Sequence, residues 1–253
     1  MAAATSSVTA EHSESGKWLI AIAVVLAAAL EVLDVTIINV SLAHIQGSFS
    51  ASVDESTWVL TSYLVANGIM IPMIGWISAR YGRKRYFLFS VLLFIFASAL
   101  CGVTTSLDEM VLFRLVQGAA GAAMIPLSQS ILMETFPPSE QQLAMAIWGL
   151  GLMVAPITGP TLGGWITDNL SWRWNLYINV PIGLAAFAMV SWFVHHPAYL
   201  RERQAPGGKV DYLGIIYLAV GLGLLQLVLD RGQRLDWLAS NGSGTGRSFP
   251  DSA

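Results

Sequence analysis

Seven long apolar stretches, separated by short polar segments, organise this chain. They cover residues 18–40, 57–79, 86–107, 110–133, 143–167, 176–194 and 212–229, and the last is the shortest. A helix needs about 20 residues to cross the hydrocarbon core of a bilayer, and each stretch is close to that length. Since a spanning segment must satisfy its own backbone hydrogen bonds, we expect helices rather than strands. The pattern predicts an all-α, polytopic membrane helical bundle.

The polar segments set the expected divisions of the chain. Polar residues cluster at 41–56, 80–85, 134–142, 168–175 and 195–211, where we expect connections. We expect residues 1–16 to be a flexible cytoplasmic tail, followed by a six-helix unit at 17–196. A cytoplasmic loop at 197–211 then leads to a seventh membrane helix and its outer end at 212–238. The Gly/Ser-rich residues 239–253 break the apolar pattern, and we interpret them as a disordered tail produced by truncation or frameshift.

Composition supports a lipid environment and excludes several classes of protein. The chain is 55% hydrophobic and 11% charged, whereas soluble domains are about 25% charged. The net charge of −3 forms no basic stripe, so we expect no nucleic acid partner. The single cysteine, Cys101, allows no intrachain disulfide, and the four histidines lack the spacing of metal ligands. Because there is no nucleophile–base spacing, P-loop or dinucleotide fingerprint, we do not expect an enzyme.

The distribution of Lys and Arg predicts an orientation. Four basic residues lie in 80–85, and none lies in 41–56 or 105–109. Cytoplasmic loops of membrane proteins carry an excess of Lys and Arg. This bias places the N-terminus in the cytoplasm.

Glu31 and Asp34 are the first anomaly, because both are charged residues within an apolar stretch. They are three apart and therefore share a helix face. Burial and a neighbouring carboxylate both disfavour the charged form of a carboxyl, so the pair could bind and release a proton. The alternative is that Asp34 lies near the outer headgroups and makes local hydrogen bonds. The sequence leaves both interpretations open.

Arg114 is the second anomaly, one turn into the fourth stretch. It could snorkel to the membrane interface. Alternatively, it faces the interior as a fixed positive charge, tunes nearby carboxylates and binds Gln117, one turn away.

The fifth stretch carries a ridge of small residues at every fourth position, Gly151, Ala155, Gly159 and Gly163. Such a ridge allows another helix to approach closely. Two prolines in the same stretch, Pro156 and Pro160, each remove a backbone donor and are expected to bend the helix. Plain helix packing is the alternative to a specialised role.

Four segments carry a family resemblance: 33–40, 75–85, 114–118 and 151–164, with 172–183 in support. Together they resemble the major facilitator superfamily and, within it, the fourteen-helix drug:proton antiporters of the EmrB/QacA type. The match covers roughly residues 17–238. One departure is Ala79, where the loop motif of the family usually has an aspartate, and this puts the gating contact of that acid in doubt.

The resemblance implies roles for residues by their place in these motifs. It implies proton coupling at four residues: Asp34, Glu31, Arg114 and Gln117. It implies a substrate cavity or helix-packing motif at Asn39, Gly151, Ala155, Pro156, Gly159, Pro160, Gly163 and Gly164. It implies a gating loop at Gly75, Arg80, Gly82, Arg83, Lys84 and Arg85.

The resemblance also implies a function for the intact protein. The chain resembles an N-terminal six-helix half plus about one further transmembrane helix, and the intact protein would export lipophilic, often cationic compounds in exchange for protons by alternating access. It would lie in the inner or plasma membrane, with the lipid bilayer as partner and no cofactor beyond the coupling proton. A periplasmic adaptor protein is compatible with this expectation. The alternatives are a dedicated metabolite or siderophore exporter and a truncated membrane protein that does not transport.

Overall fold

The computed structural model describes residues 14–194 and ten residues between 213 and 228. These belong to two units, residues 1–210 and residues 211–253, each described by itself. The ten residues of the second unit are all helical. The remainder of the expected seventh span, the loop at 197–211 and the tail at 239–253 lie outside the described residues.

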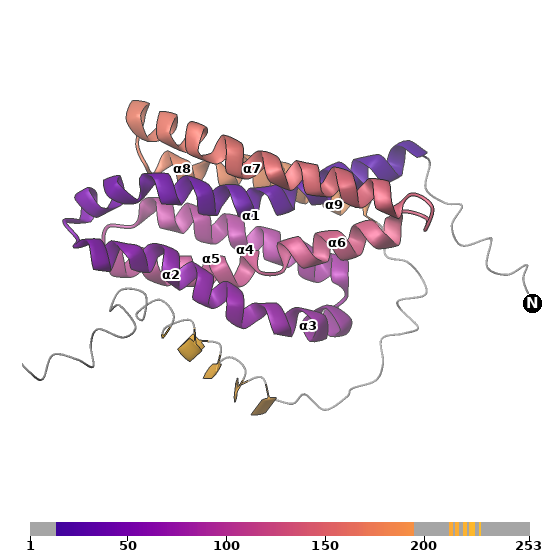
Figure 1. The fold of residues 1–253 in the computed structure, drawn as a ribbon, viewed down its shortest axis with the longest axis horizontal. Helices are drawn as coiled ribbons and strands as arrows, with labels where there is room; N and C mark the ends of the chain where they lie inside the picture. The colour runs from indigo at the N-terminus through magenta and orange to yellow at the C-terminus, as the bar shows by residue number, and fades with distance from the viewer. Residues whose placement is uncertain are drawn as a thin grey trace, which may run out of the picture. The chain divides into compact units, whose positions relative to one another are not determined.

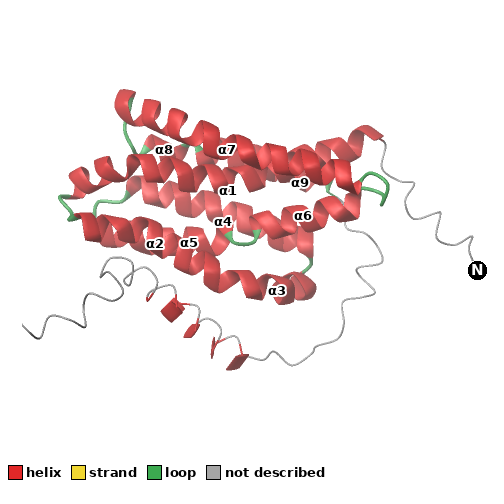
Figure 2. Cartoon of the chain, viewed as in Figure 1, coloured by secondary structure: helices red, strands yellow, loops and turns green. Residues whose placement is uncertain are grey.

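The described range of the first unit consists of helices joined by short connections (Figures 1 and 2). Its elements are α1 (Glu14–Phe49), α2 (Val53–Met70), η1 (Ile71–Met73), α3 (Ile74–Tyr81), α4 (Arg83–Val103), α5 (Leu107–Gly121), α6 (Met124–Thr135), α7 (Gln141–Asn169), α8 (Trp174–Tyr177) and α9 (Asn179–Phe193). They form six segments long and apolar enough to cross a membrane, at residues 16–49, 53–81, 83–103, 107–135, 141–169 and 174–193. The first six predicted spans are therefore confirmed in number and order.

The first helix is longer than predicted, because α1 continues to Phe49 through the polar segment at 41–49. The prediction of a connection over 41–49 is therefore wrong, and only residues 50–52 join α1 to α2. Ile45 of this segment is completely buried in an apolar cluster with Val59 and Trp172. One buried face is enough to keep a helix regular while its other face is polar.

Three of the six spans are interrupted rather than continuous, and the second of the six changes from α-helix to 3-10 helix at η1 between α2 and α3. The fourth breaks into α5 and α6 at residues 122–123, and the sixth breaks into α8 and α9 at Ile178. Pro126 and Pro181 each lie four residues beyond a carbonyl at the break, and a proline has no amide to donate to it. In contrast, α7 continues without interruption through Pro156 and Pro160.

The centre of the first unit is α1, which packs against α2, α6, α7, α8 and α9 (Figure 1). Small, fully buried residues of α1, such as Ala23 and Ala27, allow these neighbours to approach closely. Phe87 and Phe94 of α4 are fully buried in the same cluster. The core is thus built around the helix that carries Glu31 and Asp34.

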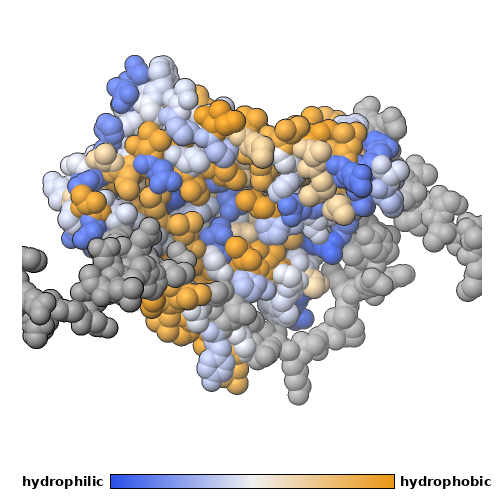
Figure 3. Space-filling view, in the orientation of Figure 1, coloured by the Kyte–Doolittle hydropathy of each residue, from blue (hydrophilic) through white to orange (hydrophobic). Residues whose placement is uncertain are grey.

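The outer surface of the unit is hydrophobic over much of the face seen in Figure 3. Large side chains of α7, including Leu150, Met153 and Ile157, are exposed. Soluble monomers rarely expose extended apolar patches. The surface is therefore that of a multi-pass membrane protein, as the composition predicted.

Candidate functional site

A fully buried ion pair lies inside the bundle. Asp34 of α1 and Arg114 of α5 both have no exposed surface, and the Arg114 Nη1 atom is 2.5 Å from Asp34 Oδ2. A charge removed from water is tolerated only when it is paired and hydrogen-bonded. The alternatives of Asp34 near the headgroups and Arg114 snorkelling to the interface are therefore wrong, since both groups face the interior and each other.

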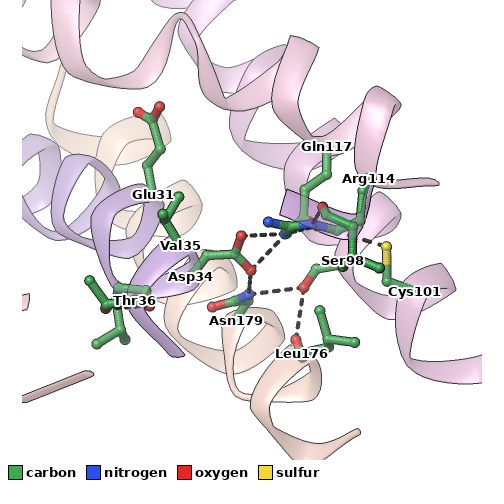
Figure 4. A network of polar contacts seen from close by, with 12 residues as sticks. Glu31, Asp34, Val35, Thr36, Ser98, Cys101, Arg114, Gln117, Leu176 and Asn179 are labelled. Carbon is green, nitrogen blue, oxygen red and sulfur yellow. Dashed lines mark hydrogen bonds and ion pairs between the residues drawn. The ribbon is translucent and has the colours of Figure 1, made fainter. Parts of the chain in front are cut away.

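Two further side chains bind this pair, and a third binds one of them (Figure 4). Gln117 accepts a hydrogen bond from Arg114 Nη1 at 2.8 Å and donates one from Nε2 to Asp34 Oδ1 at 3.0 Å. Asn179 of α9 donates from Nδ2 to Asp34 Oδ1 at 2.6 Å and to Ser98 Oγ of α4 at 2.9 Å. Through these contacts α1, α5 and α9 meet at the Asp34 carboxylate, and α4 is joined to it through Asn179.

The guanidinium of Arg114 is also held by α2. Its Nε donates to the Val59 carbonyl at 3.3 Å, and its Cζ lies 4.4 Å from the centre of the Tyr63 ring. Gly118 makes this approach possible, because a Cβ there would collide with the backbone carbonyl of Tyr63. One guanidinium nitrogen, Nη2, is buried without a hydrogen-bond partner.

Glu31 lies apart from this pair. Its carboxyl points away from Asp34 in Figure 4 and accepts a hydrogen bond at Oε1 from Asn67 Nδ2 of α2 at 2.9 Å. Only 6% of the residue is exposed, and Oε2 is buried without a hydrogen-bond partner. The two carboxyls of this helix therefore have separate hydrogen-bond partners.

The small-residue ridge of α7 packs against α1. Gly151, Gly159 and Gly163 face Val25, Thr36 and Ile37, and a Cβ at Gly151 or Gly159 would collide with these side chains. Ala155 is buried in the same ridge. Of the two roles left open, helix packing is the one that this geometry provides.

Three other residues of the same predicted motif lie on the surface of the unit instead. Asn39, Pro156 and Pro160 are exposed, and the Asn39 amide donates to the Val35 carbonyl of its own helix at 3.1 Å. Gly164 is half-buried and faces Val40.

The predicted gating loop spans the junction of α3 and α4 and is helical except at Gly82, so the predicted connection over 80–85 is wrong in its extent. Gly82 has a φ of 88°, a conformation that L residues rarely adopt. Arg83 forms an ion pair with Glu134 of α6, and Lys84 donates to the Ser191 carbonyl of α9 at 2.8 Å. Two other basic residues of the loop, Arg80 and Arg85, and Gly75 are exposed. The loop is thus attached to two later helices.

Sequence reasoning missed Asn67, Ser98 and Asn179. Their signal was weak, because amides and hydroxyls are common in membrane helices and carry no charge. A second buried cluster was also missed: Asn175 Nδ2 donates to Ser41 Oγ at 2.6 Å and to Thr167 Oγ1 at 2.7 Å. No group of three or more metal-ligating side chains occurs among residues that the structure describes.

Comparisons with known proteins give consistent results. The model of the family "Major Facilitator Superfamily" matches residues 24–242. The multidrug export protein EmrB of Haemophilus influenzae is 45% identical over 223 residues, which are 88% of this chain and 43% of EmrB. The fatty acid resistance protein FarB of Neisseria gonorrhoeae is 42% identical over 217 residues, which are 85% of this chain and 42% of FarB.

Solved structures agree on the fold. The proton:xylose symporter XylE superimposes with a TM-score of 0.66 at 16% identity, covering 92% of this chain and 57% of XylE. At that identity the likeness concerns the fold alone. The chain spans about half the length of the curated relatives that it matches.

Proposed function

This chain belongs to the Major Facilitator Superfamily, and on that premise we propose that the intact protein is a proton-coupled exporter of lipophilic compounds. The family consists of transporters and is not an enzyme class. Relatives at 45% and 42% identity are named for multidrug export and for fatty acid resistance. Both names concern amphipathic or lipophilic small molecules, which supports a multidrug efflux role.

The observation that carries the proposal is the buried pair of Asp34 and Arg114 inside an apolar bundle. Ionisable residues within membrane spans are costly and mark proton or substrate pathways. A structural bundle of this size does not need such a pair, because apolar side chains of similar volume stabilise an interior equally well. The pair therefore supports a mechanism that uses charge in the membrane.

The proposed mechanism is alternating access, in which this six-helix half rocks against a second half about a central site. Proton coupling would involve Asp34, Glu31, Arg114 and Gln117. Coupling requires that the proton and the substrate prefer different conformations. Since α1, α4, α5 and α9 all contact the Asp34 network, a change of charge there would alter how these helices pack.

The setting of the transporter follows from the same premise. We propose a location in the inner or plasma membrane with the N-terminus in the cytoplasm, because four basic residues gather at 80–85. The proton is the coupling ion, and no other cofactor is proposed. A periplasmic adaptor protein is a proposed partner of the intact exporter. Export of one dedicated metabolite or siderophore remains the alternative substrate choice.

The first test is Asp34→Asn in the full-length protein. We expect proton-driven efflux to be abolished, because asparagine leaves the buried Arg114 guanidinium without a charged partner. Uptake of ethidium into inside-out vesicles with an acidic lumen measures this activity. Asp108→Asn, which removes an exposed carboxylate at the start of α5, is the matched control.

Efflux at the wild-type rate in Asp34→Asn would show that Asp34 is not needed for coupling. A wild-type protein that uses the pH gradient for a single metabolite but not for ethidium would favour the dedicated exporter. A wild-type protein that never responds to the gradient would contradict proton-coupled export itself.

A further inference from the structure

We propose that Glu31 carries the exchanged proton, and that the pair of Asp34 and Arg114 positions the helices around it without exchanging a proton. The inference deepens the proposed export function and rests on it. Its basis is the contrast between two buried carboxyls on the same helix. Asp34 has a cation beside it and polar partners on both oxygens, whereas Glu31 has no cation beside it and one oxygen without a partner.

Both carboxylate oxygens of Asp34 have polar partners. Oδ2 contacts the Arg114 guanidinium, and Oδ1 accepts hydrogen bonds from Gln117 and Asn179. Protonation of Asp34 would remove the charge that balances Arg114. Among residues that the structure describes, no other carboxylate pairs with Arg114, and a buried cation without a partner is strongly unfavourable. Asp34 is therefore a poor place to bind a proton while the helices keep this arrangement.

Glu31 has no cation beside it. The groups that face it are neutral donors, namely the Asn67 side chain of α2 and the Ile125 amide at the start of α6. The nearest charge on its own helix is Asp34, which repels an anion, and Arg114 of α5 is already paired with Asp34. With 6% of the residue exposed and Oε2 lacking a partner, a charged Glu31 would be a buried anion without a cation.

The side chain of Glu31 is closely packed where it passes α5. A Cβ at Gly121 would lie 3.4 Å from Glu31 Cγ and 2.6 Å from the Tyr63 hydroxyl, so little more than a glycine hydrogen fits between α5 and these side chains. Phe94 of α4 closes the same position at 3.3 Å. Glu31 therefore holds its proton in this conformation.

Tyr63 connects the two carboxyls. Its ring lies against the Arg114 guanidinium, and its hydroxyl, buried without a partner, lies beside the same glycine as Glu31. When the Glu31 O–H bond breaks and the proton leaves for water, the carboxylate gains a lone pair that the Tyr63 hydroxyl can satisfy by donation. That movement shifts the Tyr63 ring against the Arg114 guanidinium. A change of charge at Glu31 thereby alters the packing of the helices that are joined at Asp34.

The proposal can be tested without any substrate. Infrared spectra of the purified full-length protein in lipid are recorded across a pH titration, and the C=O stretch of a protonated carboxyl is followed. We expect the wild type to show a titrating band that Glu31→Gln lacks and that the double variant Asp34→Asn with Arg114→Gln keeps, because removing both charges of the pair leaves no free cation beside Glu31. A Glu31→Gln protein that shows every titrating band of the wild type overturns the proposal.

A transport measurement separates proton carriage from a structural role. In proteoliposomes, we expect Glu31→Gln to lose uptake of tetraphenylphosphonium driven by a pH gradient but to retain exchange of this probe at equal pH. Loss of both activities in folded Glu31→Gln protein would place Glu31 in probe binding or packing and would overturn the proposal. A wild type that moves no probe contradicts the export function, whereas the infrared result still decides the role of Glu31.

Discussion

Asn179 shows how much one neutral side chain contributes to a charged site. Its amide donates to both Asp34 and Ser98, and it thereby joins α9 to α1 and α4. A buried carboxylate that loses one donor keeps its charge but becomes less well solvated by the protein.

We therefore expect Asn179→Ala to destabilise the purified protein by about 1–3 kcal/mol, the cost of leaving buried polar groups unsatisfied. The measurement is thermal unfolding in detergent or lipid. Asn169→Ala is the matched control, because the Asn169 amide is exposed and donates only within its own helix, to the Trp165 carbonyl. Equal melting temperatures for the two variants would show that the contact with Asp34 contributes little.

The residues of the site differ in how visible they are from sequence. Charges at Glu31, Asp34 and Arg114 stand out in apolar stretches, so their presence inside the membrane could be predicted. Their pairing could not, because Arg114 lies 80 residues from Asp34 and only the folding of the whole bundle brings them together. The separation of Glu31 from Asp34 is also a packing result, since both positions fit one helix face by sequence.

At the scale of helices, close approach is set by glycines at particular contacts. Gly118 of α5 meets backbone atoms of Tyr63 on α2, and a backbone cannot move aside as the end of a flexible side chain can. Gly149 of α7 is also helical but has no neighbouring atom where its Cβ would lie.

We expect Gly118→Ala to destabilise the protein by about 1–3 kcal/mol through overpacking and to impair transport, because α2 would move away from Arg114. Gly149→Ala should be neutral or slightly stabilising, since alanine is the better helix former. Thermal unfolding of the two variants in parallel provides the comparison. A Gly118→Ala protein as stable as Gly149→Ala would mean that α2 and α5 separate at little cost.

The number and order of the spans followed from hydropathy, but their internal shape did not. The apolar pattern does not distinguish one continuous helix from two joined by a break, as in α5 and α6. The continuation of α1 to Phe49 was missed because its residues look polar in sequence, whereas burial of Ile45 depends on Val59 and Trp172. Boundaries of this kind are decided by tertiary contacts.

At the scale of the whole molecule, the orientation in the membrane is open to direct test. Residues 83 and 103 mark the two ends of α4, so the basic loop before it and the acidic turn after it lie at opposite ends of one span. The excess of basic residues at 80–85 places the first end in the cytoplasm.

We expect a cysteine introduced at Asp108 to react with a membrane-impermeant maleimide in intact cells, and one introduced at Arg85 to react only after permeabilisation. Both positions are exposed, and the native Cys101 is buried, so the unmodified protein serves as the unlabelled control. The reverse pattern of labelling would invert the proposed topology.

The buried pair has a consequence for how the protein is made. A ribosome delivers Asp34 to the membrane 80 residues before Arg114 and 145 residues before Asn179. Placing a single charged residue at the centre of a membrane helix costs about 2.5–3.5 kcal/mol on insertion scales. We therefore expect the nascent first helix to stay near the translocon until Arg114 has been synthesised. Asp34 gains its last hydrogen-bond donor, Asn179, only when α9 emerges. All the partners of Asp34 that the structure describes belong to this six-helix half, so its charge is neutralised without contacts from another half.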